Sequence, residues 1–552
     1  MGDSSTPVCR ADEKLESATD SSTMEPSPAP ASAPRDWRFW IVFPTLCLSG
    51  FAVTMEGSIV VTALPTISRA LRTTQYAWIV NAYTLAATIF QPLTGWLAGV
   101  FGRKPVMLAA ILCFGIGSAV AGAAHHFAVI LVGRLIQGIG GGAIPLVAEI
   151  IISDMVSIEE RPKMLGIVMA TSCLGLLLGP IFGGVIVDHT TWRWIFWLNL
   201  PLVGASILCL FPVLARRTEE QRAAGRSLKI ATRNFDWVGN ILLPASTISL
   251  LLPLTMGGRV YSWSSFRVIV PLVLGVLGFV TFGLYEHFFC KNQLIPLRFL
   301  RNISHLSLQI QSFIQSMILM WVNYFLTVYF QAVLEDSPQK AGFDLMPTVV
   351  GMVVFSIVGG IAMSALKSSL SFLVNVIAFT LLAVGLGVFT LFNADTSTAV
   401  HAVLQIIVAA GNGFLLATLL PAIQKHFPDS DIEAVTALFN FIRSIALVWG
   451  VTIPAIIFDQ TMNDNVSDVP SDVRDLLVNG GAYARASRTF IQSFSGRVKE
   501  QVVGLYTSSL RATWWGAMSF ALLGLALVAL QRPQQPQPSP EPEEAEKHEN
   551  SV

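Results

Sequence analysis

Residues 127–153 read FAVILVGRLIQGIGGGAIPLVAEIIIS, an apolar run with a single arginine, Arg134, and a single glutamate, Glu149. A helix needs about 20 mostly apolar residues to cross the hydrocarbon core of a bilayer, and this run is longer. Its two charged residues are too few to form the solvated face of a helix in a soluble protein. The run therefore predicts a membrane-spanning helix.

The composition extends this conclusion to all 552 residues, of which 53% are hydrophobic and 13% are charged. A soluble domain carries about 25% charged residues, so these charges cannot cover a soluble surface of this size. The formal net charge is zero, which offers no basic surface for a nucleic-acid partner. We expect an all-α integral membrane protein that contacts the lipid bilayer and binds no nucleic acid.

Apolar stretches of similar length recur along the chain, and we count fourteen membrane-spanning helices. An even number places both tails on the same side of the membrane. The short loops on that side carry 15 lysines and arginines, whereas the opposite short loops carry six. Because positive residues favour the cytoplasmic side, both tails are predicted to be cytoplasmic. The expected spans are 40–63, 77–100, 106–124, 127–153, 164–187, 194–214, 235–256, 268–289, 304–330, 343–363, 370–391, 399–423, 432–458 and 512–530.

Several kinds of chemistry have no place in this layout. The sequence contains no G-x-x-x-x-G-K-[ST] loop for nucleotide phosphates and no H-E-x-x-H zinc motif. No segment outside the spans exceeds about 55 residues, which leaves no room for a catalytic domain. We expect no enzyme activity, no cofactor and no metal site, and we expect transport driven by an ion or solute gradient.

The loop between the second and third spans reads GWLAGVFGRK and ends in two cations. It resembles the signature loop of the major facilitator superfamily, G-x-L-a-D-r-x-G-r-k. In the family, the acid of this loop makes a charge contact that locks two halves of the protein together on the cytoplasmic face. Gly99 stands at that position here, so this chain lacks the acid. The matching residues are Gly95, Gly102, Arg103 and Lys104.

Arg134 places a guanidinium inside the hydrocarbon, which costs about 2.5–3.5 kcal/mol on insertion scales and requires a reason. Its surroundings match the R-x-x-q-G motif of the superfamily, which the resemblance links to proton coupling. Residues 55–65 resemble the l-D-x-T-i-v-n-v-A-L-P motif of drug:proton antiporters, with Glu56 in place of the aspartate. Glu56 and Arg134 each lie about seven residues, or roughly 10 Å, from the outer end of their spans. We expect the two side chains to pair.

The fifth span contains GLLLGPIFGG, which places small residues four apart beside a proline and permits close helix contact. It matches the G-x-x-x-G-P-x-x-G-G motif that the resemblance associates with antiporters rather than uptake systems. The runs WRWIFWLNLP at 192–201 and WIVNAY at 78–83 resemble the fourteen-span drug:proton antiporter branch. The motif residues are Gly175, Gly179, Pro180, Gly183 and Gly184.

The resemblance implies two six-helix bundles related as repeats, with two helices inserted between them. In the second bundle, Gly360 and Lys367 keep only the spacing of a degenerate signature loop. We expect a disordered cytoplasmic N-terminal tail over 1–38, a six-helix bundle over 39–214, a linker with two inserted helices over 215–303, a second six-helix bundle over 304–530 with an extracellular loop over 459–511, and a disordered cytoplasmic C-terminal tail over 531–552.

These motifs predict a proton-coupled efflux transporter that exports drugs, toxins or secondary metabolites by alternating access. A proton would move inward on Glu56, beside Arg134, in exchange for a small organic substrate that moves outward. We expect a monomer in the plasma membrane. The candidate substrate cavity comprises Asn81, Tyr83, Gln311, Gln315, Asn323, Tyr324, Asn412, Asn440 and Arg443. Among these, Arg443 requires an anion, which an acidic substrate or a carboxylate of the protein would supply.

Other functions share this architecture. A proton-coupled importer of siderophores or nutrients has the same number of spans. A vacuolar transporter of basic amino acids also has them, and in that case the chain would lie in the vacuolar membrane. A non-transporting receptor would need a longer signalling tail. The triplet Asn465-Val466-Ser467 is a predicted glycosylation acceptor in the outer loop.

Overall fold

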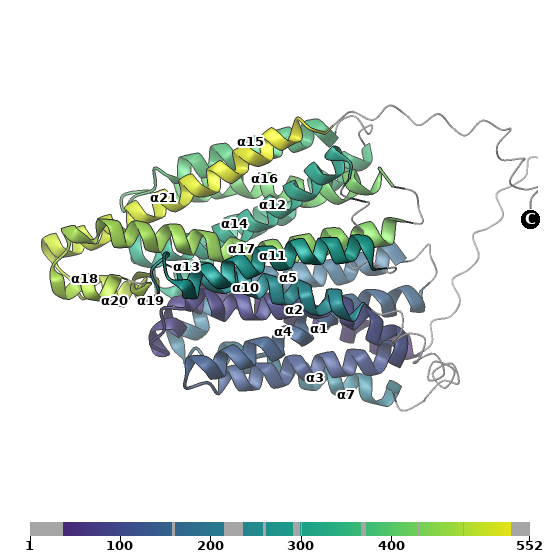
Figure 1. Cartoon of the computed structure of the whole chain (residues 1–552). Helices are drawn as coiled ribbons and strands as arrows, with labels where there is room; N and C mark the ends of the chain where they lie inside the picture. Colours follow the sequence, from purple (N-terminus) through teal and green to yellow (C-terminus); the bar gives the residue numbers. More distant parts are fainter. Residues whose placement is uncertain are drawn as a thin grey trace, which may run out of the picture.

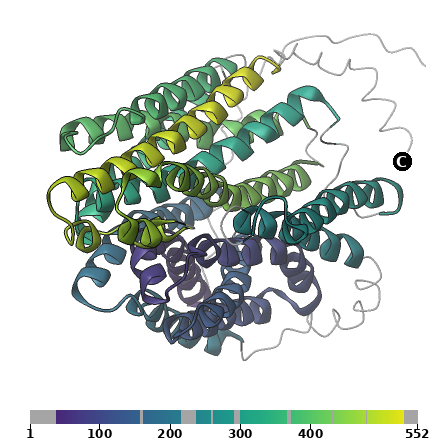
Figure 2. The ribbon, with the colours of Figure 1, turned by 60° about the vertical axis from the view of Figure 1, so that its left-hand side comes forward.

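The computed structural model describes residues 37–156, 161–214, 236–257, 261–290, 299, 301–365, 371–427, 431–478 and 480–531. Within these ranges the chain forms helices and no named strand. The predicted tails at 1–38 and 531–552 fall almost wholly outside the described residues. Figures 1 and 2 show two groups of helices, with the first half of the chain in purple and blue and the second half in green and yellow.

The first half forms a bundle in which α1 packs along α5, and α4 packs against both α2 and α3. The sixth predicted span is divided into two helices around Leu198. The helices of this bundle are α1 (Trp37–Ala70), α2 (Tyr76–Phe101), α3 (Arg103–Gly122), α4 (Phe127–Met155), α5 (Arg161–His189), α6 (Trp194–Trp197) and α7 (Asn199–Leu214).

Two inserted helices, α10 (Trp237–Met256) and α11 (Phe266–Phe288), form an antiparallel pair between the bundles. In α10, Trp237 packs edge to face on Trp96 of α2, with 5.8 Å between the ring centroids. The helix also contacts α17 of the second half. The pair therefore lies at the boundary of the two bundles, where Figure 1 shows it in teal.

The second half forms the other bundle, in which α14 and α15 pack on α16, and α12 packs on α17. Its long helices are α12 (Ile303–Val328), α14 (Met346–Ala365), α15 (Ser371–Phe389), α16 (Thr398–Gln424), α17 (Ile432–Asn465) and α21 (Gly496–Val528). Its short elements are the π-helix η2 (Tyr329–Val333), α13 (Pro338–Asp344), η5 (Val466–Asp468), α18 (Ser471–Leu477), α19 (Gly481–Ala484) and α20 (Arg488–Ile491).

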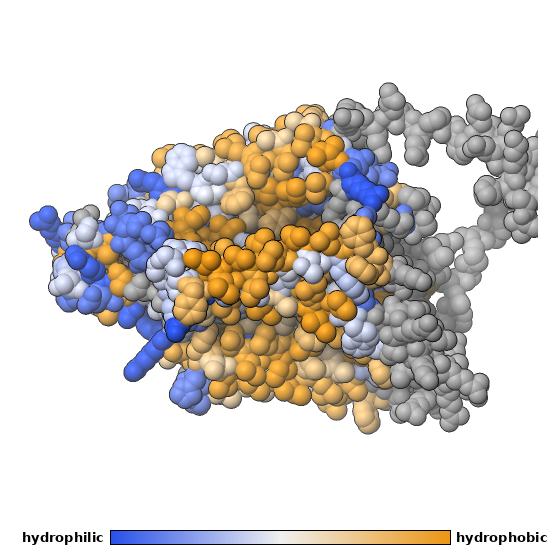
Figure 3. Space-filling model, viewed as in Figure 1, coloured by the Kyte–Doolittle hydropathy of each residue, from blue (hydrophilic) through white to orange (hydrophobic). Residues whose placement is uncertain are grey.

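The predicted membrane architecture is confirmed. Among the described residues, 13 helical segments are long and apolar enough to cross a bilayer. The 26-residue helix α2 stands where the remaining predicted span lies. Figure 3 shows an apolar band over the helices and a hydrophilic end beyond it, where α18 and α20 lie.

The helix ends differ from the prediction on one side of the molecule. We call this side the outer end; α17 ends and α21 begins there, opposite the start of α1. The sequence predicted a loop over 459–511, but α17 continues to Asn465 and α21 already begins at Gly496. The hydropathy pattern stops where polar residues begin, whereas a helix can continue beyond the bilayer if it packs on protein.

Residues 466–495 fold back over the outer end, and we call this segment the outer cap. Tyr483 of the cap stacks on Tyr76 of α2, with 3.7 Å between ring centroids and 7° between ring planes. Arg69 of α1 donates to the hydroxyl oxygens of Ser487 (3.1 Å) and Thr489 (2.8 Å). The cap belongs to the second half of the chain and closes on the first.

Candidate functional site

Glu56 of α1 and Arg134 of α4 form an ion pair inside the first bundle. Both side chains are buried, with exposed fractions of 0% and 1%. Arg134 lies seven residues into α4 as expected, but α1 continues to Ala70, well beyond the predicted end of its span. The sequence expectation that the two side chains share a depth agrees with their direct contact.

A network of buried amide and hydroxyl groups surrounds this pair. Asn199, the first residue of α7, donates from Nδ2 to Glu56 Oε2 over 2.6 Å. The guanidinium of Arg134 donates to Gln137 Oε1 (2.8 Å), and Gln137 in turn donates to Ser118 Oγ (2.7 Å). Helices α1, α3, α4 and α7 therefore each supply a polar group to one buried site.

Arg134 also contacts α2 and α6. Its Nε donates to the backbone carbonyl oxygen of Ile79 over 2.9 Å. The guanidinium carbon lies 4.4 Å from the centroid of the Tyr83 ring and 5.8 Å from that of Phe196. These ring faces favour a cation electrostatically. Tyr83, which was predicted to line the substrate cavity, lies against the guanidinium of the ion pair.

Three members of this network were not predicted from the sequence. Gln137 stands three residues after Arg134 and therefore on the same face of α4, which is a signal that the sequence carries. Asn199 is an amide within an otherwise apolar run, which is also readable. Ser118 of α3 gives no such signal, because its role depends on how α3 packs against α4.

The glycines of the fifth-span motif face α1, the helix that carries Glu56. A Cβ atom at Gly179 would lie 2.9 Å from the backbone nitrogen of Ile59, so only glycine permits this approach. Ser58 and Thr62 of α1 donate to the carbonyl oxygens of Gly175 (3.4 Å) and Pro180 (3.3 Å). Gly183 faces Ile59 and Thr62, whereas Gly184 faces Pro338 and Gln339 of α13 in the other half.

Hydrogen bonds join the two halves towards the outer end. Gln331 of η2 donates to the carbonyl oxygen of Thr62 over 2.9 Å. Asn81 of α2, a predicted cavity residue, is buried and donates to Thr452 Oγ1 of α17 over 2.8 Å. The backbone N–H of Gln339 donates to Asp188 Oδ2 over 2.9 Å. The largest buried apolar cluster also contains residues of both halves, including Ile59, Ala77, Trp321 and Tyr483.

In the second bundle the structure brings three predicted cavity residues together. Arg443 of α17 donates from Nε to Ser316 Oγ of α12 over 3.2 Å, and Ser316 donates to Gln315 Oε1 over 3.1 Å. Gln315 then donates to Asn412 Oδ1 of α16 over 3.4 Å. A polar chain therefore connects α17, α12 and α16.

The remaining predicted cavity residues lie apart from this chain. Gln311 bonds Ser307 of its own helix (2.9 Å) and accepts from Gln531 (2.8 Å). Asn323 donates to the carbonyl of Leu319 in its own helix over 2.8 Å. Tyr324 is buried in the cluster shared by both halves, and Asn440 is exposed.

At the signature loop a tight turn connects α2 to α3. Gly102 links α2 to α3 with φ at 89°, a left-handed conformation that favours glycine. Arg103 is exposed and Lys104 half-buried, while Gly95 and Gly99 lie within α2. In the second half Gly360 lies in α14, and Lys367 falls outside the described residues.

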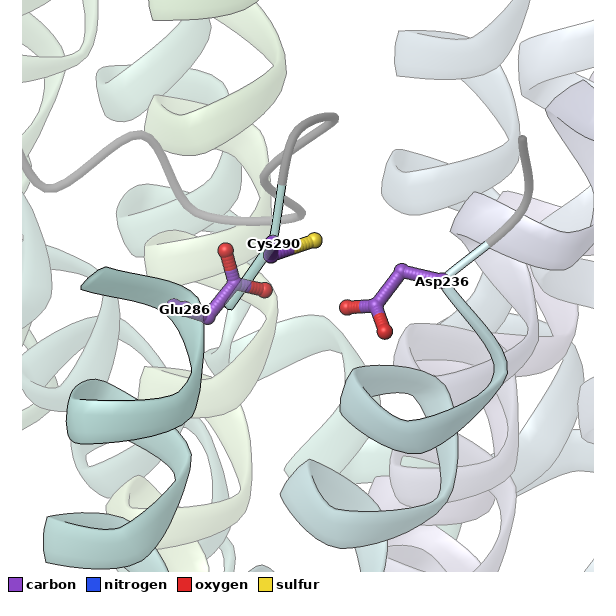
Figure 4. Close-up of side chains that lie close together, drawn as sticks. All are labelled: Asp236, Glu286 and Cys290. Atoms are coloured by element: carbon purple, nitrogen blue, oxygen red, sulfur yellow. The ribbon is translucent and has the colours of Figure 1, made fainter. Parts of the chain in front are cut away.

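Asp236, Glu286 and Cys290 lie together at the ends of the inserted helices (Figure 4), with their ligand atoms within 4.8 Å of one another. Asp236 Oδ1 accepts from the backbone N–H of Gly239 (2.9 Å) and from the Tyr285 hydroxyl (3.0 Å). Asp236 therefore caps α10 and ties it to α11, which is a structural role.

Asn465, the predicted glycosylation acceptor, is exposed and is the last residue of α17.

Comparison with known proteins identifies the family. The model of the family described as Major Facilitator Superfamily matches residues 46–451. The chain is 38% identical over 501 residues to the MFS efflux transporter aclA of Aspergillus oryzae, covering 90% of each protein. It is 37% identical over 514 residues to the efflux pump FUS6 of Gibberella moniliformis, covering 92% of this chain and 90% of that one.

Solved structures show the same fold at low sequence identity. A bacterial homologue of the human lysosomal transporter Spinster, in an inward-facing and unoccupied conformation, superposes with a TM-score of 0.61. The two sequences are 13% identical, and the match covers 92% of this chain and 100% of the other. A peptide transporter, POT, in complex with sulfate superposes with a TM-score of 0.56 at 15% identity, covering 91% of this chain and 98% of that one.

Proposed function

The chain belongs to the major facilitator superfamily of membrane transporters, and we propose that it exports small organic molecules from the cytoplasm in exchange for protons. The observation that carries this proposal is the buried pair of Glu56 and Arg134 with its shell of amides and hydroxyls. Ionisable residues inside a membrane domain are costly and mark ion or proton pathways.

The pair can exist in two charge states. With Glu56 ionised, its carboxylate accepts from Arg134 and from Asn199, so both oxygens have partners. With Glu56 protonated, Arg134 retains Gln137, the Ile79 carbonyl and the Tyr83 ring. Neither state leaves the guanidinium without partners, which is what a site that binds and releases a proton in each cycle requires.

The position of Glu56 on α1 links its charge state to the contact between the two bundles. Glu56 lies on α1, whose Thr62 receives a hydrogen bond from Gln331 of the other half. Addition or removal of the proton changes the forces on α1, and therefore on the contact that closes the outer end. In alternating access the two bundles rock about a central site, so such a contact must break in each cycle.

Export rather than uptake is supported by two observations. The relatives at 37% and 38% identity are named efflux transporter and efflux pump. The glycine motif of α5, which resembles the antiporter motif, holds α5 against α1 and α13. We propose drugs, toxins or secondary metabolites as substrates and the plasma membrane as the location of a monomeric transporter.

A proton provides enough energy for concentrative export. One proton that crosses a potential of 100 mV releases about 2.3 kcal/mol, and one pH unit adds about 1.4 kcal/mol. Together they sustain roughly a 500-fold gradient of a neutral substrate with one proton exchanged per cycle.

The test compares Glu56→Gln with Glu149→Gln, a matched control at an exposed glutamate of α4. Inverted vesicles with an acidic lumen are incubated in a medium that contains fluorescein, Nile red or rhodamine 6G, which are anionic, neutral and cationic dyes. The wild type and Glu149→Gln should accumulate at least one dye, and Glu56→Gln should accumulate none. Acid-driven accumulation in Glu56→Gln, or outward flux from the lumen in the wild type, would overturn the proposal.

A second measurement does not depend on the substrate. Difference infrared spectroscopy of the purified protein after a pH jump should show the carboxyl stretch of a buried acid, and the band should vanish in Glu56→Gln. A pH-jump band that is unchanged in this variant would assign the proton to another group.

A further inference from the structure

Among the described residues, Arg134 and Arg443 place guanidiniums inside the membrane domain, and their surroundings differ. Arg134 is paired with Glu56 and is 1% exposed. Arg443 is half-buried, and the only hydrogen bond of its guanidinium within the described part of the chain runs from Nε to Ser316. No carboxylate of the described residues lies within 4.0 Å of it. The positive charge of Arg443 is therefore not neutralised by the protein residues described here.

Arg443 lies deep within the membrane domain rather than at its inner surface. It stands 11 residues after the start of α17, about 17 Å along the helix. Ser316 stands 13 residues after the start of α12, about 20 Å along that helix, which also runs outward. Asn412 stands 12 residues before the end of α16, about 18 Å from its inner end. Three helices thus place the group at one depth.

The polar chain fixes the direction of the guanidinium. Ser316 accepts from Nε and donates to Gln315, and Gln315 in turn donates to Asn412. The two terminal nitrogens of the guanidinium remain as a planar fork of donors, the geometry that binds a carboxylate through two parallel hydrogen bonds. The same two donors converge on the single charged oxygen of an enolate. The Phe439 ring, whose centroid lies 5.4 Å from the guanidinium carbon, adds an apolar surface beside it.

We propose that Arg443 binds the acidic group of the exported substrate, so that the transporter selects organic anions with a carboxylate or an acidic enol next to an apolar body. This inference rests on the proposed export function and specifies its substrate class. The anion neutralises Arg443 inside the membrane domain, and its departure to the outside restores an uncompensated charge that favours the next anion.

Export of an anion in place of a neutral substrate changes the net charge that is moved in each transport cycle. When one proton enters and one monoanion leaves, two elementary charges move inward in each cycle, instead of one for a neutral substrate. The membrane potential, negative inside, then drives both steps. Export of an anion should therefore depend more steeply on potential than export of its neutral analogue.

The test uses the full chain in lipid nanodiscs and acid–amide pairs of nearly equal shape: 1-naphthoate with 1-naphthamide, cinnamate with cinnamamide, and decanoate with decanamide. Isothermal titration calorimetry should show at least one acid binding to the wild type about tenfold or more tightly than its amide. Arg443→Gln should remove this preference without weakening amide binding, and Arg443→Lys should retain part of it.

The controls separate this proposal from the proposed function. Thr380→Val, which removes an exposed hydroxyl bonded within its own helix α15, should keep the preference for acids. Glu56→Gln should keep acid binding while it abolishes proton-driven export, so the two proposals fail independently. The inference is overturned if no acid binds more tightly than its amide to the wild type, or if Arg443→Gln leaves the preference unchanged. Equal loss of acid and amide binding in both Arg443→Gln and Arg443→Lys would also overturn it.

Discussion

Gln331 in η2 donates a hydrogen bond to the backbone carbonyl oxygen of Thr62 in α1 over 2.9 Å. Thr62 lies six residues after Glu56 in the same helix and also donates to the carbonyl of Pro180 in α5 over 3.3 Å. One turn of α1 is therefore tied both to its own bundle and to the opposite bundle. Opening of the outer end must break the bond to Gln331 but can keep the bond to Pro180.

Gln331→Met should weaken closure of the outer end. The substitution keeps the side-chain length but removes the donor, and a buried hydrogen bond contributes about 0.5–1.5 kcal/mol. The closed population should fall roughly 2- to 10-fold relative to the open one. Distances between spin labels at the exposed residues Ala70 and Arg488 report this change. Asn323→Leu is the control, and a distribution identical to wild type in Gln331→Met would contradict the prediction.

Arg134→Met should destabilise the protein by about 3–5 kcal/mol, because it leaves Glu56 as a buried charge without its cation. The double variant Glu56→Gln/Arg134→Met should recover most of this loss, because no unpaired charge remains. Thermal unfolding in detergent, followed by tryptophan fluorescence, measures both effects. A double variant no more stable than Arg134→Met would show that the cost arises from packing instead.

Gly179→Ala should lower the stability of the first bundle by about 1–3 kcal/mol, since overpacking forces the backbone to move. The new Cβ would lie 2.9 Å from the backbone nitrogen of Ile59 in α1. A shift of α1 that relieved this contact would also displace Glu56, which lies on the same helix. Gly204→Ala in α7 is the matched control, because no atom lies within 4 Å of its added Cβ. The midpoint of thermal unfolding should fall for the first variant only.

Tyr483→Phe and Tyr483→Ala should have opposite effects on the outer cap. The Tyr483 hydroxyl is buried and has no hydrogen-bond partner in the described part of the chain, so its removal should be neutral or stabilise by about 1 kcal/mol. Removal of the ring deletes the stack on Tyr76 and should open the cap. Protease cleavage within 466–495 on intact cells should rise for Tyr483→Ala and stay low for Tyr483→Phe.

Closure of the outer cap should also depend on alkaline pH through Tyr483. Burial raises the pKa of the Tyr483 phenol well above its ordinary value of 10.0. The stabilising contribution of the neutral ring is therefore fully present below pH 10 and is lost as the pH rises towards the folded-state pKa. Cap closure in Tyr483→Phe should lack this component, which the same cleavage assay measures. Equal alkaline sensitivity in both proteins would assign the effect to another group.

The sequence predicted the long helices well because a span depends on local hydropathy, which does not require knowledge of the neighbours. It also suggested the pairing of Glu56 with Arg134, since two isolated charges in apolar helices need each other and their depth follows from helix rise. The partner Ser118 was out of reach, because α3 approaches the site only through tertiary packing.

The outer end shows a different limit. Asp459 was predicted to begin a loop, yet it is 2% exposed within α17. Hydropathy marks where a helix leaves lipid, not where it stops being helical, and the outer cap replaces lipid as the packing surface there. Asn81 shows the same limit for a side chain, because its partner Thr452 lies 371 residues away in the sequence.

The outer cap also offers a binding site for a conformation-specific antibody fragment. It is a folded segment that stands beyond the apolar band (Figure 3), and in this closed conformer it contacts α1 and α2 of the first half. An antibody fragment raised against a surface composed of Arg488, Thr489 and Arg69 would recognise the closed conformer selectively. Such a fragment would trap one step of the cycle and provide a rigid fiducial for electron cryomicroscopy of a protein that otherwise offers little mass outside the detergent micelle.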